Sequence, residues 1–358
     1  MSMDRKPPTA PLGRKAPAIR RVAVLTPVLD DWRSLTQLIK SMESRRRAAA
    51  PDLRCVYVAV DDGSQERFSL EEDEPPEGCE LHIVRLKANQ GHQRAIALGL
   101  AHVERELDVD AVLVMDADGE DRPEDALRLI SHARQNPGAV ICAARMRRSE
   151  GVVFRAFYFV YKIVFGVLTG RAITFGNFSL IPIDRLPNVI YSQGIWNNLA
   201  ATLLRCRAPI LFVPTVRGSR YFGSSKMNFV SLVLHGISVI SVFSDVVIAR
   251  VIIVLGAMFM ILSAGIAVTL FVKLGTTTFI PGYATNVILF LANMIVTTSF
   301  IGFGVVIMLL NARAMATSLP TRLYDDLVRD VTRLVSRASA AAATEEAAEE
   351  TGPAVRAR

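Results

Sequence analysis

The stretch Ala111-Val112-Leu113-Val114-Met115-Asp116-Ala117-Asp118 decides the fold class. Its apolar run predicts a buried strand, and two carboxylates follow directly at the end of that strand. The stretch from Cys55 to Val60 repeats the pattern, because it runs into Asp61-Asp62-Gly63-Ser64. Open α/β sheets bind ligands at the carboxyl ends of their strands. Paired acids there suit a divalent cation with oxygen ligands, although surface loops also produce such pairs.

Further strands and helices are expected to alternate on both sides of this stretch. Pro123 stands where the first residue of a helix would be, with acidic residues in the turn that follows. Such alternation predicts an α/β fold with a mainly parallel sheet. The expected strands are 21–26, 54–60, 81–86, 111–116 and 139–143, and the expected helices are 32–46, 91–105 and one that begins at Pro123.

Two stretches without a charged residue, 251–272 and 286–310, follow this region. About 20 apolar residues are enough to cross a hydrocarbon layer of about 30 Å as a helix. We therefore expect a two-helix transmembrane hairpin, with a pair of buried core helices as the alternative. Basic residues flank the hairpin and place both termini in the cytoplasm, at the inner membrane of a bacterium. They are Arg250, Arg313, Arg322, Arg329, Arg333 and Arg337.

Composition narrows the class of partner. The chain has 358 residues, of which 51% are hydrophobic, and a formal net charge of +7. Because the apolar stretches already tie the chain to a bilayer, the positive charge favours anionic lipid and phosphate substrates over nucleic acid. The four cysteines are scattered without metal-ligand spacing, which predicts reduced thiols.

The same features divide the chain into five segments. We expect a disordered N-terminus at 1–20, a cytoplasmic catalytic domain at 21–225, a juxtamembrane interfacial segment at 226–249, the two spans within 250–312, and a cytoplasmic amphipathic segment with an Ala/Glu-rich tail at 313–358. The apolar positions of 154–168 fall at helical spacing. This helix lies either in the membrane interface or against the core.

The order of short motifs resembles a known family. These motifs are Thr26-Pro27-Val28, Val60-Asp61-Asp62-Gly63-Ser64, Asn89-Gln90-Gly91-His92-Gln93, Met115-Asp116-Ala117-Asp118, Gly176-Asn177-Phe178 and Arg220-Tyr221-Phe222-Gly223-Ser224-Ser225-Lys226. Between residue 21 and about residue 245, the chain resembles the family 2 glycosyltransferases of the polyprenyl-phosphate branch. The resemblance implies a GT-A (Rossmann-like) fold, inverting transfer, a nucleotide-sugar donor, Mg or Mn and a polyprenyl-phosphate acceptor. It is also compatible with a homo-oligomer.

The resemblance assigns donor-binding positions. Asp118, with Asp116 nearby or through water, would hold the metal and neutralise the leaving diphosphate. The intervening Ala117 is also a donor-binding position. Asp61 matches a position that contacts the nucleotide base, and Asp62 lies beside it; a polar cap of the strand end is the alternative. The remaining donor positions are Pro27 and Asp31 after the first strand, and Asn89, Gly91 and Gln93 at the start of a helix whose amide groups suit phosphate. His92, in the same motif, would either contact the donor directly or serve as a structural, hydrogen-bonding histidine.

Basic residues form a candidate acceptor-phosphate site. Arg145, Arg147 and Arg148 follow the fifth expected strand, and Arg220, Ser225 and Lys226 form the later motif. Guanidinium groups bind phosphate with two hydrogen bonds, and lysine adds a point charge. For Arg147 and Arg148, a solvated or lipid-facing surface is the alternative.

Two positions depart from the family pattern. Asn177 stands where close relatives often carry Asp, a candidate base that an amide cannot replace. A phosphate monoester is already close to a dianion at pH 7, since its second pKa is about 6, so the acceptor needs little deprotonation. Glu120 stands where Gln is common.

A processive polysaccharide synthase and a catalytically inactive membrane scaffold remain alternatives to a UDP-hexose or GDP-mannose transferase.

Overall fold

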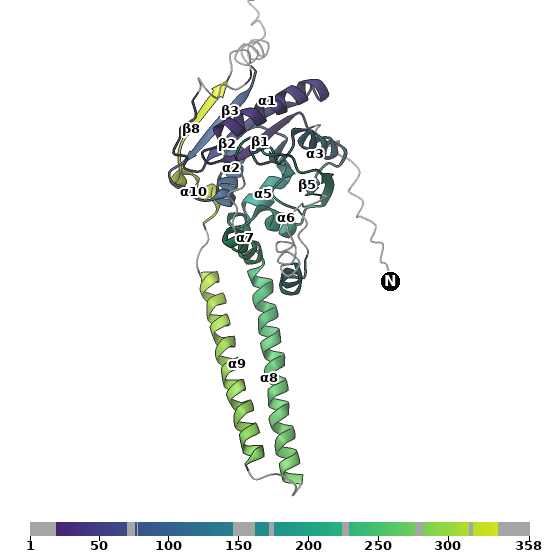
Figure 1. Cartoon of the computed structure of the whole chain (residues 1–358), viewed down its shortest axis with the longest axis vertical. Helices are drawn as coiled ribbons and strands as arrows, with labels where there is room; N and C mark the ends of the chain where they lie inside the picture. Colours follow the sequence, from purple (N-terminus) through teal and green to yellow (C-terminus); the bar gives the residue numbers. More distant parts are fainter. Residues whose placement is uncertain are drawn as a thin grey trace, which may run out of the picture.

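The structure is a computed structural model that describes residues 19–69, 76, 78–145, 162–171, 175–223, 229–275, 282–314 and 318–335. Nearly all of the expected disordered N-terminus and the whole Ala/Glu-rich tail lie outside these residues. These residues form an N-terminal domain, an apolar hairpin and the segment that follows the hairpin (Figure 1).

One eight-stranded mixed sheet organises the N-terminal domain, with the order β7-β5-β6-β4-β1-β2-β3-β8. Strands β1, β2, β3 and β4 run parallel, β5 runs parallel to β7, and β6 and β8 are antiparallel to their neighbours. The strands are β1 (Arg21–Val28), β2 (Arg54–Asp61), β3 (Glu80–Leu86), β4 (Ala111–Val114), β5 (Val140–Arg145), β6 (Ser179–Pro182), β7 (Ile210–Thr215) and β8 (Val328–Val335). The expected α/β fold with a mainly parallel sheet is confirmed.

Helices cover both faces of the sheet. One face carries α1 (Trp32–Ala49) and α3 (Pro123–Gln135); the other carries α2 (His92–Glu106), α5 (Leu186–Ile190), α6 (Leu199–Arg205) and α10 (Pro320–Leu327). Short 3-10 turns occupy Ile183–Arg185 and Gln193–Trp196. Because side chains alternate along a strand, Val22 and Val24 of β1 join the first core while Ala23 and Leu25 join the second.

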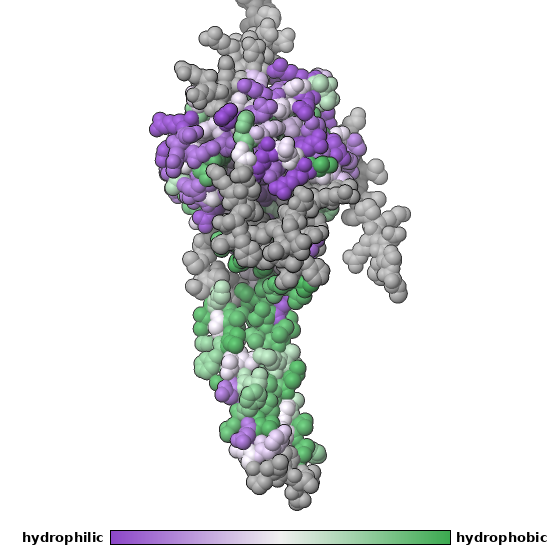
Figure 2. All heavy atoms as spheres, viewed as in Figure 1, coloured by the Kyte–Doolittle hydropathy of each residue, from purple (hydrophilic) through white to green (hydrophobic). Residues whose placement is uncertain are grey.

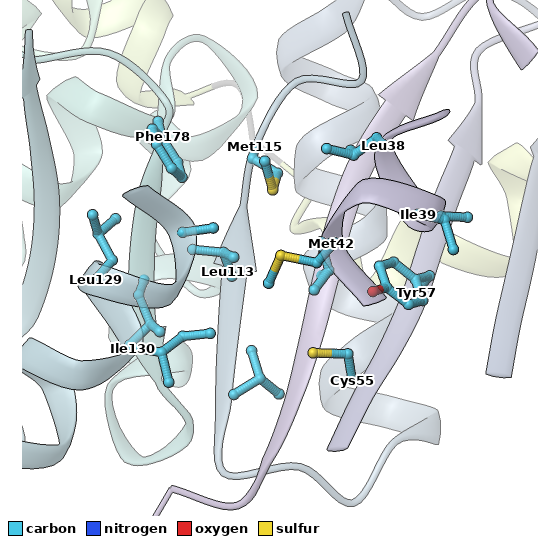
Figure 3. Close-up of a cluster of buried hydrophobic side chains, with 14 of the residues drawn as sticks. Leu38, Ile39, Met42, Cys55, Tyr57, Leu113, Met115, Leu129, Ile130 and Phe178 are labelled. Carbon is cyan, nitrogen blue, oxygen red and sulfur yellow. The ribbon is translucent and has the colours of Figure 1, made fainter. Parts of the chain in front are cut away.

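The core beneath α1 and α3 is closely packed. Figure 3 shows Leu38, Ile39 and Met42 of α1 above β2 and β4, with Leu129 and Ile130 of α3 beside them. All of these side chains are buried. The core therefore fixes the sheet from which the loops at the carboxyl edge project.

The segment after the hairpin differs from the expectation. Residues from 313 onward were expected to form an amphipathic segment and a tail, but α10 ends at Leu327 and β8 then pairs antiparallel with β3. The edge of the sheet thus contains a strand from the end of the chain. The expectation missed β6 and β7 as well, which are short strands between irregular loops.

The hairpin consists of α8 (Ser244–Gly275) and α9 (Tyr283–Ala314). In each helix only 6% of the most apolar window is buried by protein, which argues against buried core helices. Figure 2 shows this apolar surface along the hairpin, in contrast to the polar domain. The two helices lie side by side in Figure 1, and are candidate membrane spans by length and composition. Each has 32 residues and is about 48 Å long, so its ends reach beyond a hydrocarbon core.

The domain joins the hairpin through a small third core. Phe165, from a helical turn at 162–169, packs edge-on against Phe243, which follows α7 (Phe229–Ser241). Arg205 of α6 forms two hydrogen bonds to the carboxylate of Asp245 at the start of α8, at 2.7 and 2.9 Å. Val167, on the other side of the 162–169 helix, is exposed. The described part of the expected 154–168 helix therefore has both a core-facing and an exposed apolar side.

Candidate active site

Six loops meet at the carboxyl edge of the parallel strands. They follow β1, β2, β3, β4 and β7, or precede β6, whose first residue Ser179 pairs with Val114 at the end of β4. Parallel strands bring their carboxyl ends to one edge, which is where open α/β sheets bind ligands. The topology therefore brings together residues that are up to about 190 positions apart in the sequence.

The acidic loop after β4 contains the candidate metal ligands. Asp118 Oδ1 accepts the backbone N–H of Glu120 at 2.9 Å, and its Oδ2 lies 2.9 Å from Nη2 of Arg220. Asp116 Oδ1 lies 3.6 Å from Nε2 of His92. Ala117 points into the core, so it can offer only its backbone to a ligand. The buried Asp121 fixes the turn by accepting the N–H of Asp116 at 3.1 Å.

Two carboxylates suit a cation that is completed by substrate. In the described part of the chain, no group of three or more His, Cys, Asp or Glu side chains is placed to hold a metal ion. Mg²⁺ is commonly bound by one or two carboxylates together with phosphates and water. Asp116 and Asp118 therefore fit a metal that arrives with a diphosphate better than a metal enclosed by protein alone.

The loop after β7 packs directly on the acidic loop. Tyr221 N–H donates to Asp118 O at 2.8 Å, and Gly218 N–H donates to Glu120 O at 2.9 Å. A Cβ atom on Gly218 would lie 2.2 Å from the carbonyl oxygen of Gly119, so only glycine permits this approach. Gly119 has a φ of +90°, which favours glycine. This contact brings Arg220 to the candidate metal ligand Asp118.

Glu120 is a partner of two arginines. Its Oε1 accepts from Arg220 Nε at 3.0 Å and from Arg217 Nη2 at 2.7 Å, and its Oε2 accepts from Arg217 Nε at 3.0 Å. Burial alone would raise the pKa of Glu120, but the hydrogen bonds from Arg217 and Arg220 outweigh it and lower that pKa. Arg220 thus contacts both Glu120 and Asp118.

Asp61 and Asp62 have different roles in the structure. Asp61 Oδ1 accepts the N–H of Ser64 at 2.8 Å and shapes its own turn. Asp62 accepts the N–H of Gln90 at 2.6 Å and that of Gly91 at 2.9 Å. Burial raises the pKa of Asp62, and these two N–H groups partly offset the rise. Asp62 therefore holds the start of α2. The sequence predicted that amide groups here would be open to phosphate, but those of Gln90 and Gly91 donate to Asp62 instead.

Other predicted donor residues also hold loops together. Gln93 Oε1 accepts the N–H of Leu199 at the start of α6, at 2.8 Å, so part of its side chain serves packing. Asn89 is exposed beside this loop, and Pro27 is half-buried in β1. Asp31 precedes α1 without a capping hydrogen bond from its side chain. The neighbouring Asp30 instead accepts the N–H of Gln65 at 2.7 Å.

Asn177 and His92 lie between the acidic loop and β6. Asn177 Nδ2 is 3.1 Å from Nε2 of His92, the nitrogen that also faces Asp116. Exclusion of water by the surrounding loops lowers the pKa of His92, and the carboxylates of Asp62, Asp118 and Asp121 oppose this effect only partly. A neutral His92 can accept the side-chain N–H of Asn177 at Nε2, and the same nitrogen then cannot donate to Asp116.

Of the remaining predicted basic residues and Ser225, the structure describes only the backbone of Arg145. The backbone of Arg145 pairs with Thr215 at the end of β7, on the active-site edge of the sheet. Arg147, Arg148, Ser225 and Lys226 lie outside the described residues. Sequence reasoning missed Arg217, although its spacing of three from Arg220 was a visible signal.

Comparison with known proteins gives one family. Residues 23–182 match the family described as glycosyl transferase family 2. The undecaprenyl-phosphate 4-deoxy-4-formamido-L-arabinose transferase of Klebsiella pneumoniae subsp. pneumoniae is 27% identical over 228 residues, covering 61% of this chain and 65% of that protein. The protein of the same name from Erwinia tasmaniensis is 28% identical over 230 residues, covering 60% and 66%. The chain thus spans slightly less than two thirds of these relatives.

Solved structures with similar folds include two sugar-phosphoglycerate synthases. Glucosyl-3-phosphoglycerate synthase from Mycobacterium tuberculosis, in complex with Mn²⁺, uridine diphosphate and phosphoglyceric acid, has a TM-score of 0.46 at 14% identity, covering 64% of this chain and 78% of that one. Mannosyl-3-phosphoglycerate synthase from Rubrobacter xylanophilus has a TM-score of 0.43 at 13% identity, covering 63% and 73%.

The family match and the mixed α/β sheet confirm the GT-A-like fold that the resemblance implied. The chain thus contains a region, residues 23–182, that matches the glycosyl transferase family 2 domain.

Proposed function

We propose that this protein transfers a sugar from a nucleotide-sugar to a polyprenyl phosphate at the cytoplasmic face of the membrane, with inversion and with Mg or Mn. The observation that carries the proposal is the meeting of Asp116 and Asp118 with Arg220 at the carboxyl edge of the sheet. Two carboxylates that suit a metal–diphosphate thus lie beside a guanidinium group that suits the phosphate of the acceptor. The names of the curated relatives, undecaprenyl-phosphate sugar transferases, support the same acceptor class.

Asp118 and Asp116 would hold the divalent ion, which supplies positive charge to the departing nucleoside diphosphate. Asp61 lies at the end of β2 and would contact the nucleotide base, whereas Asp62 keeps the start of α2 in place. A UDP-hexose is the favoured donor and GDP-mannose is the alternative. In this arrangement the sugar would lie between the acidic loop and the loop after β7.

Arg220 would orient the acceptor, together with Lys226, Ser225, Arg145 and Arg147 from the neighbouring segments. An oxygen of the lipid phosphate attacks the anomeric carbon while the bond to the nucleoside diphosphate breaks, so the configuration inverts. A phosphate monoester has a second pKa of about 6 and is mostly a dianion at neutral pH. Asn177 can therefore serve by orientation alone, without taking a proton.

The hairpin would bring the lipid to this site. The chain leaves the domain along α8, returns along α9 and adds β8 to the same sheet, so both ends of the hairpin lie on one side. The basic residues that flank the hairpin support a cytoplasmic position for that side, by the positive-inside rule. The acceptor headgroup then meets the domain at the membrane surface.

The test is transfer by purified full-length protein from radiolabelled UDP- and GDP-sugars to undecaprenyl phosphate in detergent. We expect one donor to give a labelled lipid. Undecaprenol, which lacks the phosphate, is the matched control acceptor and should give none. If folded protein transfers no sugar from any of these donors to undecaprenyl phosphate, the proposal is wrong, and the inactive-scaffold alternative gains support.

A further inference from the structure

Glu120 and its two arginines form an ion-pair network beside the metal ligands that the proposed reaction does not use. The Glu120 side chain is only 11% exposed, whereas Arg217 is 39% and Arg220 is 30% exposed. The Glu120 side chain is therefore nearly buried. Such enclosure makes its hydrogen bonds to arginine stronger than those of a surface pair.

Arg220 uses different atoms for its two carboxylate partners. Its Nε donates to Glu120 Oε1 at 3.0 Å, while its Nη2 lies 2.9 Å from Asp118 Oδ2. Rotation of the guanidinium about its Nε end can therefore release Asp118 without breaking the bond to Glu120. Glu120 is the fixed partner because Arg217 also holds it, through two hydrogen bonds.

A cation on Asp118 conflicts with the present position of Arg220. Asp118 Oδ1 already accepts the N–H of Glu120, and Oδ2 faces Arg220. A divalent ion lies about 2.1 to 2.5 Å from a carboxylate oxygen, which would place it close to the guanidinium charge. Like charges at such a distance repel each other, so Arg220 must leave Asp118 when that carboxylate binds metal.

We propose that Glu120 is a positioning residue: it retains Arg220 at the active site when Asp118 exchanges that arginine for the metal. The released Nη groups then face the phosphates that the proposed reaction brings together. Without the Glu120 charge, Arg220 has a stronger preference for Asp118 and competes better with the metal. This inference rests on the proposed function, because it requires a metal-bound diphosphate at Asp118.

Arg217 makes the proposal separable from a simple charge effect. Its two hydrogen bonds place a positive charge directly on Glu120, which offsets part of the field of Glu120 at the metal position. Most of the influence of Glu120 on metal affinity should then pass through Arg220. A direct effect of the Glu120 charge would instead persist when Arg220 is absent.

The test is a double-mutant cycle on Mn²⁺ binding by full-length protein in detergent, measured by electron paramagnetic resonance with UDP and, separately, GDP present. We expect Glu120→Gln to weaken Mn²⁺ binding about fivefold in the parent chain, and less than about twofold in an Arg220→Gln background. Glu124→Gln is the matched control, since Glu124 pairs with Arg45 on α1. It should leave the affinity unchanged.

Two results would overturn the inference alone: no weakening by Glu120→Gln, or the same weakening in both backgrounds. Binding stoichiometry and melting temperature, measured on each variant, identify loss of folded protein, which would lower the number of sites rather than the affinity. If Mn²⁺ fails to bind the parent chain both in the presence of UDP and in the presence of GDP, the proposed function fails as well. Failure of the proposed function and failure of the inference thus give different results.

Discussion

Charged and polar side chains meet at two places, the carboxyl edge of the sheet and the region where α2 and α10 pack on β3. The side chains are paired differently at these two places. At the carboxyl edge, Arg220 is shared between Asp118 and Glu120, and the arginines remain partly exposed. Beside β3, the rings of His82 and His102 are buried. We call the first group the exchange network and the second, made of Glu80, His82, His102 and Tyr324, the closed network.

Every ring nitrogen in the closed network has a partner. His82 Nε2 lies 3.1 Å from Glu80 Oε1, His82 Nδ1 lies 3.2 Å from His102 Nε2, and His102 Nδ1 lies 2.7 Å from the Tyr324 hydroxyl. One proton arrangement satisfies all of them: Tyr324 donates to His102, His102 donates to His82, and His82 donates to Glu80. Both rings are neutral in that arrangement.

The two networks differ in whether their hydrogen-bond partners can change. Carboxylates with shared, partly exposed partners can trade one cation for another at low cost. A buried chain with one consistent proton arrangement cannot, and it fastens α10, which follows the hairpin, onto α2 and β3. The following predictions separate the two networks by activity and by stability.

Replacing Asp118, the proposed metal ligand, should give the largest effect. We expect Asp118→Asn to lower sugar transfer roughly thousandfold, since a metal supplies several kcal/mol to charge stabilisation in the transition state. The melting temperature in detergent should change little, because the exchange network lies at a solvent-facing edge. Asp325→Asn is the control, as Asp325 is 72% exposed and pairs with Arg105. Activity retained by Asp118→Asn would contradict the assignment of this loop.

Acid should loosen the closed network. Burial lowers the pKa of His102 from 6.5 to about 4, and repulsion from His82, when that ring is charged, and from Arg105 adds to this effect. The folded state therefore favours the neutral ring; its stabilisation is fully present above pH 6.5 and is lost as the pH falls towards 4. The expected loss is up to about 3 kcal/mol. The pKa of Glu80 is lowered to about 2, and its hydrogen bond with His82 is the main cause. Glu80 therefore stays ionised throughout this pH window.

Melting temperatures between pH 7.5 and pH 4.5 test this dependence. His102→Gln should lower the melting temperature at neutral pH and flatten its decline in acid. The exposed His132 on α3 provides the control, and His132→Gln should leave the decline unchanged. An unchanged pH dependence in His102→Gln would show that other groups cause the acid sensitivity.

Removing one hydroxyl should have a smaller effect on stability. Tyr324→Phe leaves Nδ1 of the buried His102 without its donor, which costs about 1 to 3 kcal/mol. Transfer activity per folded protein should stay the same. Tyr191→Phe is the matched control, because the Tyr191 hydroxyl makes a 3.3 Å hydrogen bond to Glu104 at an exposed position. Equal melting temperatures for the two variants would argue against docking by the closed network.

Restoring an acid at residue 177 should have the smallest effect. If the acceptor is already a dianion, Asn177→Asp should change the transfer rate by less than about threefold at pH 7.5. The new charge beside His92 should raise the pKa of that ring, because a nearby anion favours its protonated form. A rate increase of about a hundredfold would instead mean that the parent chain lacks a needed base.

Much of the fold followed from local sequence patterns. The apolar run that ends at Asp116 and the alternation around it predicted the parallel strands, since buried strands have a strong local signal. Strand β8 gave no such signal: Val328, Val331 and Leu334 recur every three residues, as in a helix. Its conformation depends on pairing with β3, about 250 residues earlier in the chain, a tertiary contact that overrides local preference.

The candidate site was predictable by residue type but not by partner. The acids at the ends of β2 and β4 were expected, whereas the use of Asp62 and Gln93 to hold loops was not. Glu120 was noticed only as a departure from the family pattern. Its pairing with Arg217 depends on β7 lying beside β5, and no local pattern encodes that contact.

The most direct test of the account is the recovery of activity after metal removal. Full-length protein is stripped with EDTA and given the active nucleotide-sugar and undecaprenyl phosphate, with and without restored Mn²⁺ or Mg²⁺. The account predicts that labelled polyprenyl-phosphate sugar forms only when the divalent ion is restored, and that Asp118→Asn recovers almost none. Equal transfer by the stripped and restored protein would contradict the central role of the acidic loop.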